Sequence, residues 1–480
     1  MRGDRQRRRA RRHARFCHPP LHRHPPGALG GAIAAGGACR DPACRTGGAR
    51  HGRQRGGRLV KRATRRVDTG LAVIGTGIAG FAAALFARAR GLEVAQLGHS
   101  GALAYTTGYL DLLGVANGSS IADPWSGIDA LRTAEPANPL GFLDTVALRD
   151  AMDSFVRDLN AMGLGYTAPG AANLTALLPY GVTKPTLSLP ETMRPGCEAL
   201  AAKAPALIVD FDGLQGFSAR EFVTNIAGQW PGLTPLRLGF PGMEGTQVFP
   251  EAMARALETR PTRAALADRI RPNLGGVTHV GLPAVLGVRN PDAVRAEMEA
   301  RLGVTLFEIP TIPPGVPGIR LREVLTRSLP ERGVMLEPNL KVSSVSFSEA
   351  GITLALHGPM EDLEIHARAV LLATGRFLSG GLGATRSGVF ERLIGLDIQQ
   401  PASREAWFAE DYLAPEGHAL NRAGVVVDRH FRPLDASGAP VDPRLFAAGS
   451  ILAGQDWVRS RSGAGLAIAS AWGAVQALPP

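Results

Sequence analysis

Apolar positions near residue 70 alternate with turn-forming glycines in an order that predicts three consecutive elements. An uninterrupted apolar run, Leu71–Ile74, ends at a glycine and is typical of a buried strand. An alanine-rich segment over residues 81–90 follows and favours a helix, which Gly91 ends. A second apolar segment, Leu92–Leu97, comes next. The order strand, tight turn, helix, strand predicts the opening of a dinucleotide-type βαβ unit.

The turn in this unit has the glycine spacing of a phosphate-binding loop. Gly75, Gly77 and Gly80 form the pattern G-x-G-x-x-G, which a chain with 59 glycines contains about once by chance, so the flanking strand and helix carry the argument. Gly75 permits the turn, Gly77 lets a phosphate approach the backbone, and Gly80 allows close packing. The helix N-terminus adds amide donors and a positive dipole. The cofactor-binding residues predicted here are Gly75, Thr76, Gly77, Ile78, Ala79 and Gly80.

The end of the second strand lacks a side chain that a site for an adenine dinucleotide usually has. An Asp or Glu about 20 residues after the glycine loop accepts hydrogen bonds from the ribose hydroxyls. Gly98 holds that place here, and His99 follows it. The sequence therefore supports phosphate binding and leaves three alternatives open: FAD held by other groups, a mononucleotide such as FMN, or a decayed site.

Two later segments repeat the arrangement of a strand that ends in glycine. One apolar strand ends in Ala-Thr-Gly at residues 373–375, and another ends in Gly-Ser at residues 449–450, before a glycine-led helix near residue 463. Strand ends that meet at the carboxyl edge of a parallel sheet are typical of a site for a phosphate-bearing cofactor. The further cofactor-binding residues predicted here are Thr374, Gly375, Gly449, Ser450, Gly463 and Gly465.

The middle of the chain differs in pattern from the glycine-rich segments on either side. Residues 116–330 mix proline-rich loops with short helices and strands, and residues 144–162 carry an apolar stripe at helical spacing. We therefore expect an α/β protein in which a split Rossmann-like domain comprises residues 68–115 and 331–480. Residues 116–330 are expected to form an inserted α+β domain that covers the substrate.

Charge divides the chain sharply at about residue 67. Residues 1–67 carry 18 Arg and one Lys against two Asp, a net charge of +17, whereas the remaining residues carry a net charge of −6. Residues 1–67 also contain few large apolar side chains, which predicts a disordered basic extension. The alternatives are an arm that binds RNA or lipid, a targeting peptide, and a misassigned start codon with translation beginning near Val67. A further alternative is a metal box built from Cys17, His18, His22, His24, Cys39 and Cys44.

Several classes of protein are excluded for the part of the chain after residue 67. Its net negative charge argues against a nucleic-acid-binding face, and we expect no nucleic-acid partner. Cys197 is its one cysteine, so it has no disulfide framework. No uninterrupted run of 18 apolar residues predicts a membrane span. No metal site is predicted there.

Taken together, these motifs resemble a known family. Val-Ile-Gly-Thr-Gly-Ile-Ala-Gly, Leu-Leu-Ala-Thr-Gly and Leu-Phe-Ala-Ala-Gly-Ser resemble two-domain flavoproteins with a substrate domain inserted into a split flavin domain. Within that group the chain resembles the B subunit of the anaerobic glycerol-3-phosphate dehydrogenase, from about residue 70 to residue 476. The segments that carry this likeness are Thr106-Thr-Gly-Tyr-Leu-Asp-Leu-Leu113, Pro310-Thr-Ile-Pro-Pro-Gly-Val-Pro-Gly-Ile-Arg-Leu321, Phe377-Leu-Ser-Gly-Gly-Leu382 and Ile394-Gly-Leu-Asp-Ile398.

The resemblance implies a flavin subunit, with FMN as the cofactor and FAD as the alternative. It implies a complex that oxidises sn-glycerol 3-phosphate to dihydroxyacetone phosphate and passes electrons to quinone. The implied partners are an FAD-bearing catalytic subunit and an iron-sulfur subunit that docks at the membrane. The chain would then be cytoplasmic and peripheral on the inner membrane through that partner. Related flavoproteins have an Asp where Ser450 stands, and that Asp binds the ribityl hydroxyls.

A phosphorylated alcohol needs cations for its phosphate and a base for its hydroxyl proton. Arg320, Arg376 and Arg386 are the candidate phosphate contacts. No catalytic base is evident, because none of the six histidines after residue 67 lies in a motif. We therefore expect this subunit to relay electrons while a partner performs the oxidation. The alternatives are a non-catalytic scaffold with the flavoprotein fold and a flavin oxidoreductase that acts on another hydroxy acid.

Overall fold

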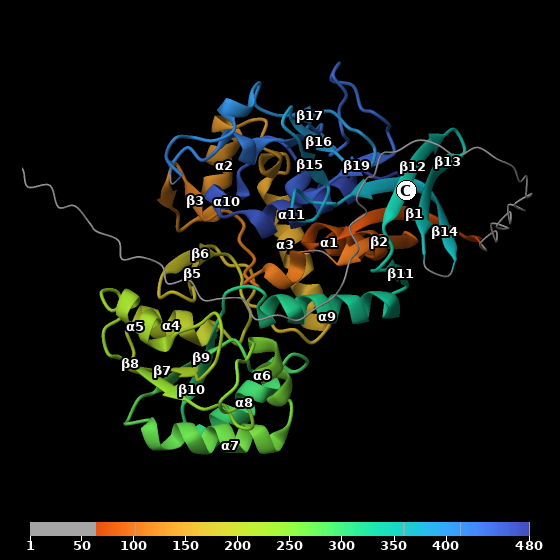
Figure 1. The fold of residues 1–480 in the computed structure, drawn as a ribbon. Coiled ribbons are helices and arrows are strands. Elements are labelled where there is room, and N and C mark those ends of the chain that lie inside the picture. Colours follow the sequence, from red (N-terminus) through yellow and green to blue (C-terminus); the bar gives the residue numbers. More distant parts are fainter. Residues whose placement is uncertain (1–63, 101, 359–360, 413, 480) are drawn as a thin grey trace, which may run out of the picture. The chain divides into compact units, whose positions relative to one another are not determined.

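The computed structural model describes residues 64–100, 102–358, 361–412 and 414–479, except for the side chains of His99 and Ser100 (Figure 1). The predicted N-terminal extension and its alternatives lie almost entirely outside these residues, as does the metal box. Within them, strand β1 already begins at Thr64. No helix in the described ranges is long and apolar enough to cross a membrane.

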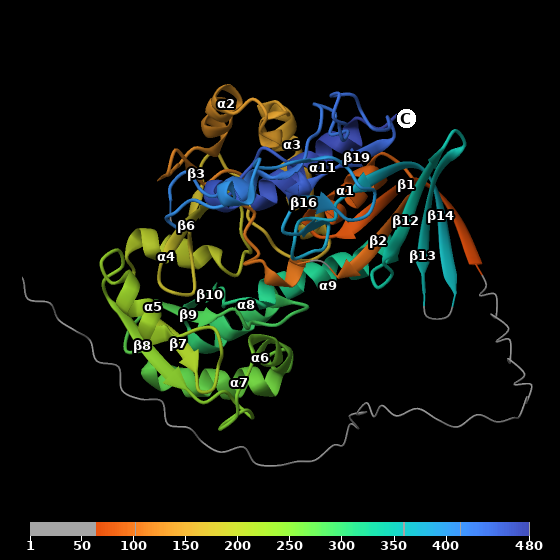
Figure 2. The same cartoon turned by 45° about the horizontal axis from the view of Figure 1, so that its top comes forward.

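A large mixed sheet contains the predicted βαβ unit. Its parallel part has the order β11-β2-β1-β14, and β19 pairs with the final residues of β14. Leu71 of β1 lies opposite Val94 of β2 and Ala369 of β14. Two antiparallel strands extend the sheet beside the first half of β14 (Figure 2). The strands are β1 (Thr64–Thr76), β2 (Val94–Ser100), β11 (Val334–Glu337), β12 (Val342–Ser348), β13 (Gly351–His357), β14 (Asp362–Leu372) and β19 (Leu445–Ala447).

Two apolar helices pack together beside this sheet. Helix α1 (Ile78–Ala89) is rich in alanine and buries a continuous run from Ala79 to Ala87. Helix α11 (Gly463–Gln476) is almost wholly buried as well, and the ring of its Trp472 meets the ring of Phe86 edge-on at 4.9 Å. Small side chains allow this close contact, and burial of apolar surface on both helices stabilises it.

A second, four-stranded sheet lies in the middle of the chain. Its order is β10-β9-β7-β8 and all its pairs are parallel. Its own apolar core is centred on large buried side chains that include Trp230 and Phe307, whose rings stack at 5.9 Å. The elements of this region are α4 (Arg194–Ala202), β7 (Ala206–Phe211), α5 (Ala219–Ile226), β8 (Leu233–Leu238), α6 (Pro250–Ala256), α7 (Arg260–Ile270), η3 (Arg271–Asn273), β9 (His279–Pro283), α8 (Pro291–Leu302) and β10 (Thr305–Ile309).

The segment between the two sheets packs partly with the first core. Buried side chains of α2 (Pro124–Ala134) and α3 (Thr145–Ala161) belong to the same apolar cluster as β1 and α1. Helix α9 (Val316–Glu331) leads back from the second sheet to β11. In Figures 1 and 2, α9 lies between the elements of the two sheets. The domain division at residues 115 and 331 stays a prediction.

The remaining elements are short. They form hairpins and single turns around the large sheet and along the segment that leads to the second sheet. They are η1 (Ala102–Tyr105), β3 (Val115–Ala116), β4 (Ser119–Ser120), η2 (Pro139–Gly141), β5 (Leu174–Leu177), β6 (Thr183–Thr186), β15 (Leu382–Ala384), β16 (Val389–Glu391), β17 (Ile398–Gln399), η4 (Arg404–Ala406), η5 (Ala419–Arg422), β18 (Gly424–Val425), η6 (Gly449–Ile451) and α10 (Trp457–Ser460).

Candidate flavin-binding site

The glycine turn between β1 and α1 is packed tightly on two sides. Gly75 has φ +134°, and a Cβ atom at this residue would lie 2.2 Å from the carbonyl oxygen of Ala373 on the neighbouring strand segment. A Cβ atom at Gly80 would lie 2.1 Å from the carbonyl oxygen of Gly75. A side chain at either residue would force the backbone apart, so both glycines let strand and helix approach closely.

Gly77 faces open space instead. A Cβ atom there would meet no described atom within 4 Å, and the backbone of Gly77 is extended, with φ −89°. Gly77 is the N-cap of α1, and no side chain caps the first amides of this helix in the described residues. Unpaired amides and the helix dipole at an open N-terminus favour an anion. This side of the turn therefore has the form of a phosphate site.

Gln96 supports the turn from the neighbouring strand β2. Its side chain is fully buried, and its Nε2 donates a hydrogen bond of 2.9 Å to the carbonyl oxygen of Gly75. Its Oε1 is buried and has no hydrogen-bond partner in the described residues. Sequence reasoning missed this residue, although a polar side chain inside an apolar strand was a signal. At the end of β2, Gly98 has φ +140° and offers no carboxylate.

The ends of β14 and β19 converge on the same turn. Gly449 has φ +81°, and a Cβ atom there would lie 2.8 Å from the Cβ of Ala79 in α1. A Cβ atom at Gly375 would lie 3.6 Å from the Oγ of Ser450. The Oγ1 of Thr374 is buried and lacks a hydrogen-bond partner among the described residues. The structure thus brings together the predicted residues of three strand ends.

The turns at Gly77, Thr374 and Gly449 are called the cradle below. Helix α11 connects this cradle to the loop at Asp111. Ser470 is fully buried in the helix, and its Oγ accepts a hydrogen bond of 2.8 Å from the amide of Gly449. The first turn of α11 contains the predicted residues Gly463 and Gly465. The amide of Gly465 donates a hydrogen bond of 2.7 Å to the carbonyl oxygen of Asp111. These two glycines therefore lie at the start of the helix, not at the phosphate turn.

The residues present fit the phosphate-bearing part of a flavin. The cradle offers open amides at the start of α1, an unsatisfied hydroxyl on Thr374 and a half-exposed serine, Ser450. A buried hydroxyl without a partner costs free energy unless a ligand completes its hydrogen bonds. No group of three metal-ligating side chains occurs among the described residues.

Arg320, a predicted phosphate contact, forms a buried ion pair with Glu308 instead. Its side chain is 1% exposed, and its Nη1 and Nη2 donate hydrogen bonds of 2.6 and 2.8 Å to the carboxylate of Glu308. Its Nε donates to the carbonyl oxygen of Gly287 at 2.8 Å. A bidentate pair of this geometry holds both groups firmly. All three nitrogens of Arg320 are engaged within the protein, and the side chain is buried, so this arrangement does not offer Arg320 to a substrate.

The other two arginines lie in the loops around the hairpin of β15 and β16. Arg376 is half-buried, and its two terminal nitrogens donate to the carbonyl oxygens of Asn421 and Leu420. Burial lowers the pKa of Arg376, and the charge of Asp456 opposes that change. Arg386 is exposed in the hairpin turn and makes no ion pair with the described residues. Both remain candidates for anion contact.

Three histidine side chains have structural partners. His366 contacts Glu364 at 2.8 Å and His357 contacts Asp362 at 3.1 Å. The Nδ1 of His418 accepts a hydrogen bond from the amide of Ala409. These three described side chains therefore make their contacts outside the cradle.

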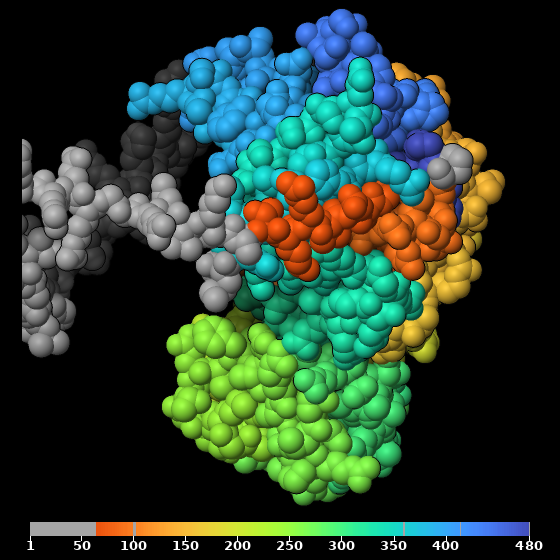
Figure 3. All heavy atoms as spheres, turned by 90° about the vertical axis from the view of Figure 1, so that its right-hand side faces the viewer, coloured from red at the N-terminus to blue at the C-terminus, as the bar shows by residue number. Residues whose placement is uncertain are grey.

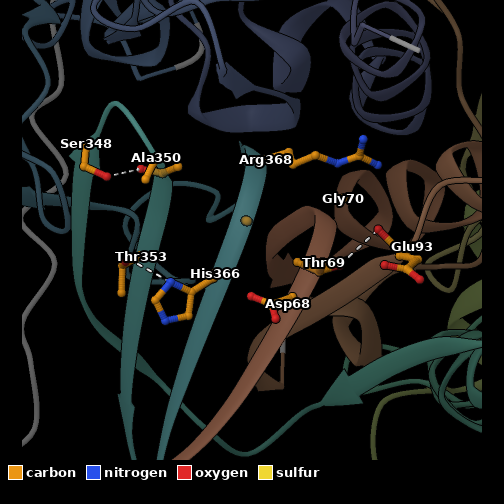
Figure 4. Close-up of a pocket in the computed structure, with 11 residues that line it drawn as sticks. Asp68, Thr69, Gly70, Glu93, Ser348, Ala350, Thr353, His366 and Arg368 are labelled. Atoms are coloured by element: carbon orange, nitrogen blue, oxygen red, sulfur yellow. Dashed lines mark hydrogen bonds between the residues drawn. The ribbon is translucent and has the colours of Figure 1, made fainter.

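A surface hollow of about 280 Å³ lies away from the cradle (Figure 4). Asp68, Glu93, His366 and Arg368 line it, and Thr69 beside them donates a hydrogen bond of 3.0 Å to the carbonyl oxygen of Glu93. Asp68 and Thr69 lie before the carboxyl end of β1, and His366 and Arg368 lie before that of β14. Glu93 lies just before β2. In Figure 3 the red and orange surface at the start of the described chain has teal surface above and below it. The hollow is therefore separate from the strand ends that form the cradle.

The fold and the cradle define a flavoprotein with a split nucleotide-binding sheet. The family model of the FAD binding domain matches residues 70–466, so the predicted fold class is confirmed. The probable B subunit of the anaerobic glycerol-3-phosphate dehydrogenase of Halobacterium salinarum is 30% identical over 427 residues, which cover 85% of this chain and 97% of the relative. The chain belongs to the family of anaerobic glycerol-3-phosphate dehydrogenase B subunits, and the predicted resemblance is confirmed.

One further relative and one solved structure are also similar to this chain. The B subunit of the anaerobic glycerol-3-phosphate dehydrogenase of Vibrio cholerae is 29% identical over 419 residues, which cover 85% of this chain and 95% of that protein. A solved structure, the 3-ketosteroid delta1-dehydrogenase of Sterolibacterium denitrificans, is 12% identical, with a TM-score of 0.41 and coverage of 85% of this chain and 99% of that one. At that TM-score the structural likeness carries no conclusion.

Proposed function

We propose that this chain is the flavin-bearing B subunit of a complex that oxidises sn-glycerol 3-phosphate to dihydroxyacetone phosphate. The observation that carries the proposal is that Gly77, in the cradle, faces open space. The chain also belongs to the family of these B subunits. A glycine turn closed on both sides would instead favour a scaffold without a cofactor. The names of the relatives supply the substrate.

The proposed flavin contacts follow from the geometry of the cradle. The amides at the start of α1 would hold the phosphate, and Thr374 and Ser450 would donate or accept hydrogen bonds along the sugar chain. The first turn of α11, with Gly463 and Gly465, would face another part of the cofactor. The flavin supplies the capacity to accept two electrons as a hydride, and the protein supplies binding, orientation and electrostatics.

FMN is the cofactor that we propose, and FAD is the alternative. The absence of a carboxylate on β2 from Val94 to Gly98 supports FMN, because FMN has no adenosine ribose to bind. The family model, which is that of an FAD binding domain, supports FAD. Acid extraction followed by mass spectrometry distinguishes the two.

The proposed partners are an FAD-bearing catalytic subunit and an iron-sulfur subunit that docks at the membrane and passes electrons to quinone. Their support is the word subunit in the names of the relatives. Through the second partner the chain would lie on the cytoplasmic face of the inner membrane. The proposed division of labour, in which this chain relays electrons, rests on the lack of a histidine base in the described part of the cradle.

A substrate screen on the purified full chain tests this function. Anaerobic addition of glycerol 3-phosphate is expected to bleach the flavin absorbance, whereas glycerate and lactate leave it unchanged. Bleaching by another hydroxy acid alone would support the alternative oxidoreductase. Slow bleaching of the isolated chain and fast bleaching of the complex would support the relay, and equal rates would contradict it.

A further inference from the structure

The loop at residues 106–114 is held by hydrogen bonds to two other segments. The carbonyl oxygen of Asp111 accepts the amide of Gly465 at the start of α11, as described above. The amide of Leu110 donates to the carbonyl oxygen of Ser188 at 2.9 Å, just after hairpin β5–β6. These two hydrogen bonds hold the backbone at Leu110 and Asp111 in place.

Asp111 forms a nearly buried ion pair with Lys184 of strand β6. Its Oδ2 lies 2.5 Å from the Nζ of Lys184, and the two side chains are 13% and 12% exposed. The ammonium also lies 5.4 Å from the ring centroid of Tyr109. The hydroxyl of Tyr109 donates to the carbonyl oxygen of Leu177, and burial raises the pKa of Tyr109 well above its usual value. The tyrosine therefore remains a neutral donor.

The second carboxylate oxygen of Asp111 is unsatisfied. Asp111 Oδ1 is buried and has no hydrogen-bond partner among the described residues. A buried charged acceptor without a donor costs more than a neutral one, because the carboxylate has lost its water. The ammonium of Lys184 has three donor hydrogens, and Asp111 takes one of them. Among the described residues, the pair therefore combines a buried acceptor without a donor and an ammonium with further donor hydrogens.

This pair lies close to the cradle along α11. Gly465, which binds the backbone of Asp111, is five residues before Ser470, which binds the amide of Gly449. At a rise of 1.5 Å per residue, the two contacts are about 7.5 Å apart along the helix. A ligand that extends from the cradle along the start of α11 would approach the pair.

We infer that Asp111 Oδ1 accepts the hydroxyl group of the alcohol substrate, and that Lys184 is the positioning residue that holds Asp111. The inference rests on the proposed function for the substrate and the flavin, and it assigns the oxidation to this chain in place of the relay alone. A phosphorylated alcohol suits the pair, because its hydroxyl is a donor and its phosphate an acceptor. On oxidation the hydroxyl proton would go to Asp111 Oδ1, and a bound oxidised flavin would supply the acceptor for the carbon-bound hydrogen, which leaves with two electrons as hydride. The carbon–oxygen double bond forms in the same step.

The test compares two ligands on the full chain after reduction with dithionite, which prevents turnover. Glycerol 3-phosphate carries the secondary hydroxyl, and 3-hydroxypropyl phosphate lacks it. Calorimetry on the wild-type chain should show that glycerol 3-phosphate binds at least about tenfold more tightly, as expected for a hydrogen bond to a charged group. In Asp111→Ala the ratio of the two dissociation constants should fall to about one. A merely structural Asp111 would weaken both ligands equally and leave the ratio unchanged.

Further variants keep the test decisive. Asp111→Ala leaves Lys184 without its partner, so the double variant Asp111→Ala/Lys184→Met, which removes both charges, covers the case in which the single variant fails to fold. Asp129→Ala, at an exposed ion pair of α2, should leave the ratio unchanged. A ratio that persists without Asp111 overturns the inference alone. A wild-type chain that binds neither phosphate overturns the proposed function and the inference together.

The chemical role has a separate readout. In Asp111→Asn the amide oxygen still accepts a hydrogen bond but cannot take a proton. Stopped-flow reduction of the bound flavin by glycerol 3-phosphate should slow by about a hundredfold or more, while the dissociation constant changes little. An unchanged reduction rate would exclude Asp111 as the proton acceptor.

Discussion

At the scale of single residues, the glycines of the G-x-G-x-x-G motif have different surroundings. Gly80 faces the backbone oxygen of Gly75, so a methyl group there has no room, whereas Gly77 faces the open side of the turn. The motif assigns close packing to Gly80 and the approach of a phosphate to Gly77, and the neighbours of the two residues in the structure agree with that division. The close neighbour of Gly75, Ala373 on another strand, is not revealed by any local pattern.

Gly77→Ala should abolish or strongly weaken flavin binding and leave the flavin-free fold intact. The added methyl group meets no protein atom, and the φ of −89° suits alanine, but the methyl occupies the place of the phosphate. Melting of flavin-free protein and fluorescence titration with flavin measure the two effects. Gly80→Ala is the matched variant and should lower the melting temperature of the flavin-free protein. Full flavin affinity in Gly77→Ala would contradict the proposed role.

Arg320 shows why a residue type in a suggestive loop is a weak predictor of function. The proline-rich loop before a helix suggested an anion site, but the partner of Arg320 is Glu308 on β10. Their pairing depends on how α9 packs against the second sheet, which local sequence does not specify. Thr374, Gly449 and Ser450 lie just after the ends of β14 and β19, as the local sequence predicts, and their role in binding a cofactor stays a prediction. Gln96 was missed because its partner, Gly75, lies on another strand.

At the scale of elements, the buried ion pair of Arg320 and Glu308 connects helix α9 with strand β10 at the edge of the second sheet. Glu308 accepts hydrogen bonds from Arg320, from the hydroxyl of Thr192 and from the amide of Leu286. Burial alone would raise the pKa of Glu308, but the charge of Arg320 and these hydrogen bonds together lower it. The carboxylate therefore joins β10, α9 and two loops in one ionised cluster.

Arg320→Met should lower the free energy of unfolding by about 3–5 kcal/mol, because it leaves a buried carboxylate without its counter-ion. Urea denaturation measures the change. Arg271→Met, which breaks an exposed pair with Asp268, is the control and should cost less than about 1 kcal/mol. Equal effects of the two substitutions would show that the buried pair contributes no more than a surface pair.

The same carboxylate predicts a dependence of stability on pH. The pKa of Glu308 is lower in the folded chain than its ordinary value, so its contribution is complete above the ordinary glutamate pKa. It is lost as the pH falls through the lowered folded value. Denaturation curves of Glu308→Gln should therefore show a smaller loss of stability on the acid side than those of the wild type. A loss of the same size in both proteins would contradict the ionised cluster.

At the scale of the whole molecule, the chain leaves the large sheet after β2 and returns with β11. The first and last parts of the chain build one sheet, and the middle builds another with its own core. Composition predicted this interruption, because glycine-rich turns cluster at both ends. It did not predict that α2 and α3 pack with the first core, since an amphipathic helix does not specify which core covers its apolar face.

A chain that starts at Thr64 should bind flavin and melt like the full chain. The buried core begins in β1, and the side chains of Arg65 and Arg66 form ion pairs with Glu337 and Glu364. The shorter chain keeps both pairs and all of the described core, so the free energy of unfolding should change by less than about 1 kcal/mol. Differential scanning calorimetry of both chains measures it. The intact mass of the natively expressed protein shows separately whether residues 1–63 are translated.

The central claim is that the amides at the ends of β1, β14 and β19 hold a flavin. The most direct measurement is acid extraction of the folded, purified chain, followed by mass spectrometry and quantification of the released flavin. The account predicts one flavin per chain, released in lower yield from Gly77→Ala. A folded wild-type chain that carries no flavin and takes up neither FMN nor FAD would contradict it.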